Sequence, residues 1–284
     1  MTANEEKNEE YLNTQENIHT DGNAAGNIAP SVVPADKSTE IISEQIRKKL
    51  EIGNVQFDEE RLTRRANGFY NRIVKRIIDF VLALVIILLL SPVYLLISIA
   101  IVIDSGFPVF YRPYRGGYKG KNFRTCKFRT MVKNADKIGG GTTALNDSRI
   151  TRVGKFLRKT KLDEIANAFC CLIGTMSFIG PRPELTRYTD TYNDLEKHIL
   201  DVRPGITDYS SIELISLDEV VGEKNADEIY EKYVYKTKNA LRLKYVNNIS
   251  FATDVKLFFA TIGKVIGKAF RVIFKRKKKD KKQG

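Results

Sequence analysis

The sequence predicts a mainly α-helical fold with irregular and short extended segments, in a monotopic membrane protein with a broken re-entrant helix and interfacial amphipathic helices. Two observations predict this class. Residues 77–103 are almost wholly apolar and are interrupted near the middle by Ser91-Pro92, whereas about 20 apolar residues suffice to cross a bilayer. Residues 250–274 interleave apolar and basic side chains, which is typical of a helix lying in a membrane interface.

Residues 1–67 are predicted to form a disordered acidic N-terminal tail. Residues 1–45 contain nine acidic residues and two lysines, with few aromatic side chains. Such a segment cannot bury enough apolar surface to offset the entropy lost on ordering. A short helix over residues 43–51 is weakly indicated. The tail is either a solubilising extension or a regulatory, partner-binding segment.

The charge of the remaining chain indicates an anionic partner. The formal net charge is +13, and the acidic residues 1–45 contribute −7 of it, which leaves +20 for the rest. Nucleic acid, anionic lipid and a phosphorylated substrate all match this sign. Charge alone therefore does not choose among them.

The scarcity of cysteine and histidine narrows the chemistry. The three cysteines, two of them adjacent, have no C-x-x-C spacing, so neither a disulfide framework nor a zinc site is indicated. His19 and His198 are the only histidines, which nearly excludes histidine-based triads and multi-histidine metal sites. We expect a reducing, cytosolic environment and chemistry that depends on carboxylates.

Residues 68–105 are predicted to form a re-entrant membrane helix hairpin. Pro92 removes a backbone donor and clashes with the preceding turn, so the helix should break there. Each half then spans roughly 20 Å, less than the ~30 Å hydrocarbon core. Because basic residues flank both ends, the positive-inside rule places both ends in the cytoplasm. A kinked single span is the alternative, since spanning helices tolerate proline. The flanking residues are Lys75, Arg76, Arg112, Arg115, Lys119 and Lys121.

Residues 106–248 are predicted to form a cytoplasmic catalytic domain at the membrane surface. Residues 106–135 alternate short apolar runs with glycine and basic residues, which favours short extended pieces. Residues 137–147 include three consecutive glycines and predict a flexible loop. Residues 149–159 place a basic residue at every third position between apolar ones, which indicates an amphipathic helix. Its basic stripe either rests on lipid phosphates or is a solvated face.

Residues 249–284 are predicted to form an amphipathic interfacial helix followed by a polybasic tail. The helix leads into the run Lys275-Arg-Lys-Lys-Lys279, and each charge near an anionic leaflet contributes ~1 kcal/mol. Nucleic-acid binding is the competing interpretation of this tail. Because no nucleic-acid recognition motif accompanies it, we expect anionic membrane lipids and no nucleic acid as partners.

Two adjacent acids, Asp163 and Glu164, are the main candidates for chemistry. They lie in the first turn of a predicted helix, and a purely structural interpretation makes Thr160 the N-cap with the acids complementing the helix dipole. Basic residues both upstream and downstream favour a functional interpretation, because phosphoryl transfer needs cations, a metal-binding carboxylate and a nucleophile. These cations are Lys127, Arg129, Arg149, Arg152, Arg158 and Arg182.

Motifs spread over about residues 72–207 resemble the bacterial sugar transferases, the monotopic polyprenyl-phosphate phosphoglycosyl transferases. The agreement extends over many motifs at matching spacings. They are Lys75-Arg-Ile-Ile-Asp79, Ser91-Pro92, Phe110-Tyr-Arg112, Gly116-Gly117, Phe123-Arg-Thr-Cys-Lys127-Phe-Arg-Thr-Met131, Asp147-Ser-Arg-Ile-Thr151, Gly154-Lys-Phe-Leu-Arg158-Lys, Leu162-Asp163-Glu164, Met176-Ser-Phe-Ile-Gly-Pro-Arg-Pro183 and Arg203-Pro-Gly-Ile-Thr207.

The resemblance implies a reaction and roles for the residues. Asp163 would attack the β-phosphate of a UDP-sugar, release UMP and form a phosphosugar-aspartate. Polyprenyl phosphate, usually undecaprenyl phosphate, would then take the phosphosugar in a ping-pong reaction. Glu164 would bind Mg²⁺, and Ser91-Pro92 would break the membrane helix. The residues expected to contact substrate phosphates are Lys127, Arg129, Arg158 and Arg182.

The resemblance also implies a cellular setting, the cytoplasmic face of the bacterial inner membrane. There the enzyme would initiate exopolysaccharide, capsule or other glycoconjugate assembly, with downstream glycosyltransferases as partners. A catalytically silent membrane-bound scaffold is the alternative function. Departures from the family pattern follow Glu164, where Ile165-Ala-Asn167 stands in place of Leu-Pro-Gln, and follow Thr207, so the identity of the sugar stays open.

Overall fold

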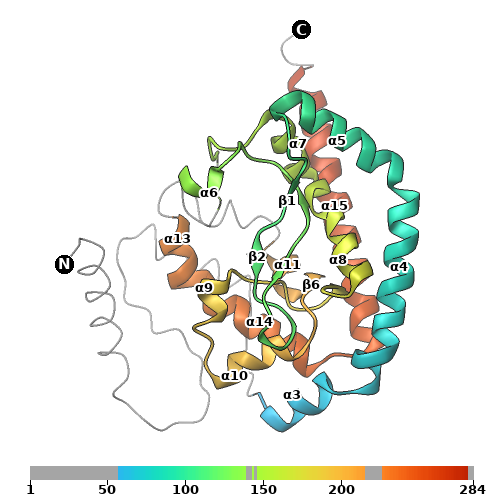
Figure 1. Cartoon of the computed structure of the whole chain (residues 1–284), viewed down its shortest axis with the longest axis vertical. Coiled ribbons are helices and arrows are strands. Elements are labelled where there is room, and N and C mark those ends of the chain that lie inside the picture. Colours follow the sequence, from blue (N-terminus) through green and yellow to red (C-terminus); the bar gives the residue numbers. More distant parts are fainter. Residues whose placement is uncertain (1–56, 139–142, 144–145, 215–225, 281–284) are drawn as a thin grey trace, which may run out of the picture. The chain divides into compact units, whose positions relative to one another are not determined.

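The computed structural model describes residues 57–138, 143, 146–214 and 226–280 (Figure 1). Most of the predicted acidic tail and the weak helix over residues 43–51 therefore lie outside the described residues. The mainly α-helical class with short extended segments is confirmed. The α-helices are α3 (Glu59–Ala66), α4 (Lys75–Leu89), α5 (Ser91–Ser105), α6 (Ala135–Ile138), α7 (Arg152–Thr160), α8 (Ala168–Ile173), α9 (Thr186–Thr189), α10 (Asp194–Lys197), α11 (Tyr209–Glu213), α13 (Ala226–Ile229), α14 (Tyr235–Asn247) and α15 (Phe251–Asp280).

Short helical turns and strands connect these helices. Strands β1 and β4 pair antiparallel, as do β2 and β3, while β5 and β6 form a parallel pair. The extended pieces expected between residues 106 and 135 are thus present as two-residue strands. The strands are β1 (Phe110–Tyr111), β2 (Tyr114–Arg115), β3 (Phe123–Arg124), β4 (Lys127–Phe128), β5 (Ser177–Ile179) and β6 (Gly205–Thr207). The turns are 3₁₀-helices η2 (Tyr118–Gly120), η3 (Leu162–Asn167) and η4 (His198–Asp201), and π-helices η1 (Tyr70–Val74) and η5 (Tyr230–Val234).

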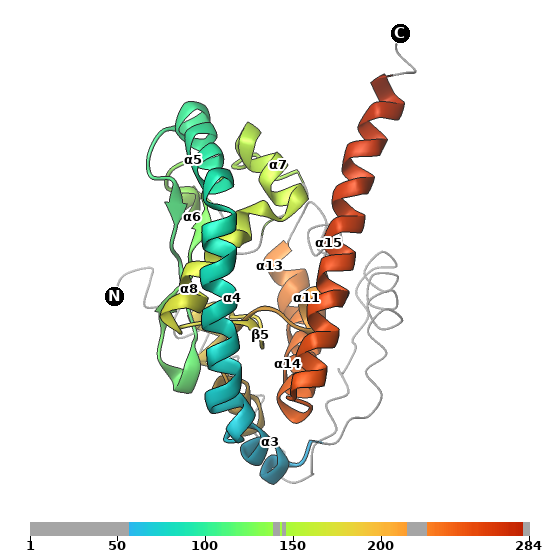
Figure 2. The same ribbon diagram turned by 90° about the vertical axis from the view of Figure 1, so that its right-hand side faces the viewer.

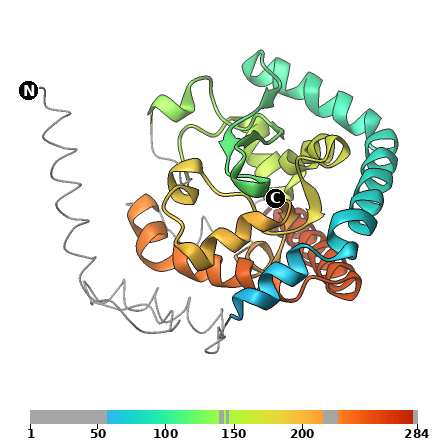
Figure 3. The ribbon, with the colours of Figure 1, turned by 60° about the horizontal axis from the view of Figure 1, so that its bottom comes forward.

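The last residues of the predicted tail are not disordered. Helix α3 is capped by Asp58, whose side chain accepts from the Glu60 N–H, and it buries Leu62 and Ala66 completely or nearly so. Helix α3 packs against α14 (Figure 3). The acidic composition hid this helix because only two of its side chains enter the core, and their partner lies far along the chain.

The apolar segment is broken between α4 and α5, next to Pro92. The amide of residue 92 would normally donate to the Leu88 carbonyl, and proline has no hydrogen there. The Ser91 hydroxyl donates to that same carbonyl oxygen at 2.9 Å. The pair Ser91-Pro92 therefore ends one helix and starts another while satisfying the exposed carbonyl group.

Helices α4 and α5 reach the length and apolar composition of a membrane span only when they are taken together, and they form a bent pair. In the described part of the chain no single helix is long and apolar enough, and Tyr70–Leu89 and Ser91–Ser105 meet at an angle of 62°. The bend between α4 and α5 is visible in Figure 1, and Figure 2 shows the pair from the side. Many large apolar side chains of this pair are exposed. They are Ile77, Ile78, Phe80, Val81, Leu84, Val85, Leu88, Leu89, Leu95, Leu96, Ile99 and Ile103.

Two hydrophobic clusters hold the described elements together. One joins α4 and α5 to β4, α7 and α8, with Phe128, Leu157 and Met176 almost fully buried. The other joins α3, α14 and the start of α15, with Leu243 and Tyr245 fully buried. Phe178 of β5 packs against both clusters, so the parallel β5–β6 pair lies between them.

The C-terminal helix α15 is longer than predicted and starts inside the core. Asp254 in its first turn accepts hydrogen bonds from the Tyr70 hydroxyl at 2.7 Å and from the Tyr245 hydroxyl at 2.8 Å, and it pairs with Lys75. Leu257 is also buried. One face of the first turns thus fastens the start of α4 to α14, while Phe251, Val255 and Phe259 are exposed on the same turns. The interfacial interpretation of residues 249–284 stays a prediction.

Candidate functional site

Asp163 and Glu164 lie on a tight turn between two helices. Helix α7 begins at Arg152 and ends at Thr160, and Lys161 then adopts a left-handed conformation with φ of 61°. The acids occupy the first turn of the 3₁₀-helix η3, not of an α-helix. Thr160 is also not an N-cap, since its hydroxyl donates back to the Phe156 carbonyl at 2.9 Å. The reversal at Lys161 brings the two carboxylates against β4 and the loop after β5.

Asp163 is a buried carboxylate without a close counter-ion. Asp163 is 7% exposed, and its Oδ1 has no hydrogen-bond partner among the described residues. Burial and then the neighbouring charge of Glu164 raise its pKa, while Lys127, Lys161 and Arg158 partly oppose this rise. An unpaired buried oxygen in a native structure needs an explanation, such as a catalytic role or a bound ion or water.

Glu164 is in the opposite electrostatic situation. Its Oε1 accepts from Lys127 at 3.1 Å, and its Oε2 accepts from Arg182 NH1 at 2.9 Å. A second Arg182 nitrogen also donates to Oε1. Burial disfavours the charged form, but the two cations outweigh it and hold the pKa of Glu164 well below its usual range. Glu164 is thus paired with cations while the adjacent Asp163 is not. Such a difference in environment lets neighbouring carboxylates take different chemical roles.

Arg182 reaches Glu164 because its backbone is fixed by the β5–β6 pair. Its amide donates to Asp208 Oδ2 at 3.0 Å, and its NH1 donates to the Ile206 carbonyl at 2.9 Å. Gly180 and Gly205 make this close approach feasible, since a Cβ on Gly205 would lie 2.1 Å from the Gly180 nitrogen. The guanidinium is therefore oriented from two strands before any ligand arrives.

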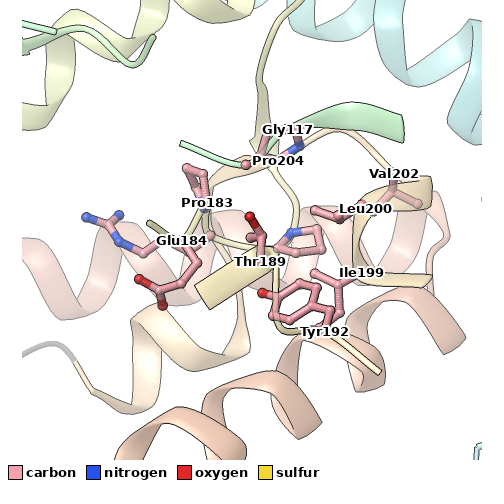
Figure 4. A pocket seen from close by; sticks show the side chains of 12 residues that line it. Gly117, Pro183, Glu184, Thr189, Tyr192, Ile199, Leu200, Val202 and Pro204 are labelled. Carbon is pink, nitrogen blue, oxygen red and sulfur yellow. The ribbon is translucent and has the colours of Figure 1, made fainter. Parts of the chain in front are cut away.

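The residue after the Pro-Arg-Pro motif, Glu184, anchors that segment in a buried charge cluster that the sequence did not reveal. Arg242, which is fully buried, donates to Glu184 at 2.8 Å, and Lys238 lies at 3.3 Å. The Tyr230 hydroxyl also donates to this carboxylate. Burial opposes the charge, but Lys238 and Arg242 lower the pKa of Glu184. Figure 4 shows Glu184 and Pro183 beside a pocket that Gly117 also lines.

Of the four predicted phosphate-binding cations, the structure brings Lys127 and Arg182 to Glu164. Arg158 donates to the Thr143 hydroxyl at 3.0 Å, and its charge acts on Asp163. Arg129 is placed elsewhere, because its NH2 donates to the Ser105 hydroxyl at 2.8 Å and to the carbonyl oxygen of the same residue at 3.0 Å. Strand β4 ends at Phe128, so the alternation that would keep residues 127 and 129 on one face does not continue. Arg129 caps the end of α5 and is not assigned to the phosphate site.

The donor set for a divalent metal at this site is small. Within the described part of the chain, no group of three or more His, Cys, Asp and Glu residues could hold a metal ion. Magnesium in phosphoryl-transfer sites is usually held by one or two carboxylates together with substrate phosphates and water. Glu164 fits that mode as a single protein carboxylate, provided that substrate phosphates take its place beside Lys127 and Arg182.

Comparison with known proteins identifies the chain. A family model described as bacterial sugar transferase matches residues 70–268. The chain belongs to this family. The match starts before the broken helix and includes the dyad, the Pro-Arg-Pro segment and residues 251–268 of α15.

Several relatives resemble this sugar transferase at 30 to 40% identity. The UDP-glucose:undecaprenyl-phosphate glucose-1-phosphate transferase of Escherichia coli K12 is 39% identical over 198 residues, covering 68% of this chain and 40% of that protein. The uncharacterized sugar transferase EpsL of Bacillus subtilis is 33% identical over 195 residues, covering 68% and 88%. The exopolysaccharide production protein ExoY of Rhizobium meliloti is 32% identical over 203 residues, covering 66% and 83%. The chain thus spans about two-fifths of the length of the E. coli transferase.

Proposed function

We propose that this sugar transferase moves a sugar phosphate from a UDP-sugar to undecaprenyl phosphate and so starts the assembly of an exopolysaccharide or related glycan. Family membership and the names of the relatives support the substrate classes. The observation that carries the mechanism is the contrast within the dyad, in which Glu164 pairs with two cations and Asp163 has a buried oxygen without a partner.

In the proposed mechanism Asp163 is the nucleophile. A carboxylate oxygen attacks the β-phosphorus of the UDP-sugar, and the bond from that phosphorus to the bridging oxygen breaks, which releases UMP. The phosphosugar stays on Asp163 as an acyl phosphate. A phosphate oxygen of undecaprenyl phosphate then attacks the same phosphorus and restores the carboxylate. Lys127 and Arg158 act on the Asp163 charge and would neutralise the phosphate oxygens during both transfers.

We further propose that Glu164 holds Mg²⁺ together with the substrate phosphates. The bound ion would neutralise charge on the diphosphate. Glu164 is ionised because Arg182 and Lys127 lower its pKa, and its carboxylate adjoins Asp163 in the chain. Lys127 and Arg182 would orient the diphosphate.

The proposed location is the cytoplasmic face of the bacterial inner membrane, with α4 and α5 as a re-entrant hairpin. The exposed apolar side chains of this pair support it, because monomeric soluble proteins rarely expose such a continuous surface. Single cysteines near residues 70 and 115 test the topology. Protection of both from an impermeant reagent outside intact cells is expected, and labelling of either would overturn the hairpin.

The activity is tested by measuring UMP release from a panel of UDP-sugars with undecaprenyl phosphate and Mg²⁺. The matched control is Asp163→Asn, a neutral amide that cannot form the acyl phosphate. Without lipid acceptor, the wild type should gain the mass of a phosphosugar on the peptide containing Asp163. A scaffold without activity would release no UMP from any UDP-sugar, and turnover by Asp163→Asn would exclude the covalent route.

A further inference from the structure

A pocket beside the dyad is lined by hydrogen-bond donors, and three of them, Arg115, Thr125 and Asn167, have no role in the proposed mechanism. Lys127 and Arg182 form part of its wall, and Arg115, Thr125 and Asn167 complete the polar part. No carboxylate is among the described residues that line it. Such a wall suits an anion with more than one charge.

Arg115 is held at this pocket by the backbone. It ends β2, where it pairs with Phe123 of β3, and the next amide, that of Gly116, donates to the Glu184 carbonyl at 3.1 Å. Gly116 permits this approach, because a Cβ there would lie 2.5 Å from Thr189 Cγ2. Strand β2 is thereby fixed to the segment that carries Arg182, and the two arginines reach one pocket from different strands.

Arg115 has no ion-pair partner in the described part of the chain. The hydrogen bond found for its guanidinium runs from NH1 to the Tyr114 carbonyl at 2.9 Å. Burial lowers the pKa of Arg115, the charges of Glu184 and Tyr111 partly oppose this, and the charge of Arg182 adds to the lowering. Lys127 also has a lowered pKa, to which burial contributes first and the charges of Arg182 and Arg115 contribute further. Lys127, Arg182 and Arg115 thus line one pocket and lower one another's tendency to stay charged, which a phosphate bound between them would relieve.

Asn167 and Thr125 add neutral donors to the same wall. Asn167 is buried, and its Oδ1 accepts from the Cys126 amide at 3.1 Å. This bond fixes the amide orientation and leaves Nδ2 as the free donor. The Thr125 hydroxyl is buried without a partner among the described residues, and a side-chain rotation would let it donate to a ligand.

We infer that Arg115 and Asn167 bind the α-phosphate of the nucleotide sugar, the phosphate that departs in UMP. This inference rests on the proposed function. Asp163 is not among the described residues that line this pocket, whereas Lys127, Arg115 and Asn167 are. Lys127 also acts on the charge of Asp163, so a diphosphate held by Lys127 would place its β-phosphate beside Asp163 and its α-phosphate in the pocket. Arg115 and Asn167 therefore serve the phosphate that Asp163 does not attack.

The test measures UMP binding by calorimetry and the KM for the UDP-sugar in the full chain. Arg115→Gln should weaken UMP binding and raise that KM by about 10- to 100-fold, the usual loss for a charged hydrogen bond. Asn167→Asp should do the same, because it keeps an acceptor for the Cys126 amide but turns the free donor into a charge that repels phosphate. The number of UMP sites per chain from the same titrations should stay unchanged in both variants, because a general folding defect would lower that number and not only the affinity.

Lys121→Gln is the matched control, since it removes an exposed cation six residues from Arg115, and it should bind UMP like the wild type. Equal UMP affinity in Arg115→Gln and Lys121→Gln would overturn the subsite. UMP binding does not require turnover. A wild type that binds UMP through Arg115 but releases none from any UDP-sugar would contradict the proposed function and leave the subsite supported.

Discussion

Arg182 engages both carboxylate oxygens of Glu164, with its NH1 donating to Oε2 at 2.9 Å and its NH2 donating to Oε1. The carboxylate proposed to hold Mg²⁺ is thus occupied by a cation of the protein itself. A substrate diphosphate would compete with Glu164 for Arg182 and Lys127. Phosphate binding and metal binding at this site should therefore assist each other.

The first prediction concerns this coupling. Mg²⁺ should bind weakly to the protein alone and more tightly, by about tenfold or more, when UMP is present, because a coupling free energy of 1–3 kcal/mol is typical of linked sites. Calorimetric Mg²⁺ titrations with and without UMP measure it. Glu164→Gln, titrated in the same way, corrects for Mg²⁺ bound by the nucleotide itself. A Mg²⁺ affinity of the wild type that does not respond to UMP would contradict the coupling.

The second prediction is that the two acids have opposite effects on stability. Asp163→Asn removes a buried charge without a close partner, so it should raise the free energy of unfolding by about 1–3 kcal/mol at neutral pH. Glu164→Gln leaves Lys127 and Arg182 without their counter-ion and should lower it by a similar amount, about 1–3 kcal/mol. Chemical denaturation of both variants gives the signs. Destabilisation by Asp163→Asn would show that its charge is compensated.

The third prediction concerns pH. Burial and the charge of Glu164 raise the pKa of Asp163, so the ionised nucleophile is lost as the pH falls through this raised pKa. The rate of covalent enzyme formation should therefore decline in acid at a higher pH than an ordinary aspartate would give. Arg158→Gln removes a cation that lowers the pKa of Asp163, so it should move the acidic limb to still higher pH. Single-turnover UMP release measured against pH reports the position of the limb; an unchanged limb in Arg158→Gln would refute the assignment.

Short stretches of sequence were enough to predict the helix break and to select the dyad and its neighbouring cations. Pro92 acts through its own missing N–H, and Ser91 satisfies the carbonyl that this leaves free, so two adjacent residues suffice to predict the break. Asp163, Glu164 and Arg182 could be chosen because they lie within short motifs. Their relative geometry could not, since it depends on the left-handed Lys161 and on the β5–β6 pair.

The buried charge clusters could not be predicted from the sequence. Glu184 pairs with Arg242, which lies 58 residues later in the sequence, and Lys75 pairs with Asp254, which lies 179 residues later. On α14 and α15 these charged residues look like solvated faces, because burial of a charge depends on a partner that only the folded chain supplies. Arg129 shows that spacing does not fix contacts either. It lies two residues after Lys127, yet its NH2 donates to Ser105 at the end of α5, and its predicted phosphate contact stays a prediction.

The last prediction separates the two halves of α15. Asp254 pairs with Lys75 and accepts from Tyr70 and Tyr245, and the Thr261 hydroxyl lies 2.9 Å from that of Thr207 on β6. A chain ending at residue 249 loses all of these contacts and should not fold. A chain ending at residue 267 keeps them and removes the polybasic run, so it should release UMP in detergent at about the wild-type rate.

The shorter deletion should nevertheless bind anionic vesicles less tightly, because each lysine or arginine near an anionic surface contributes about 1 kcal/mol. Cosedimentation with vesicles of neutral and anionic composition measures this loss, which should shrink as salt is added. Asp254→Asn in the full chain completes the comparison. It should lower the unfolding temperature while leaving salt-dependent vesicle binding intact at temperatures where it is folded. Equal vesicle affinity of the full chain and the chain ending at residue 267 would show that the apolar surface alone holds the protein at the membrane.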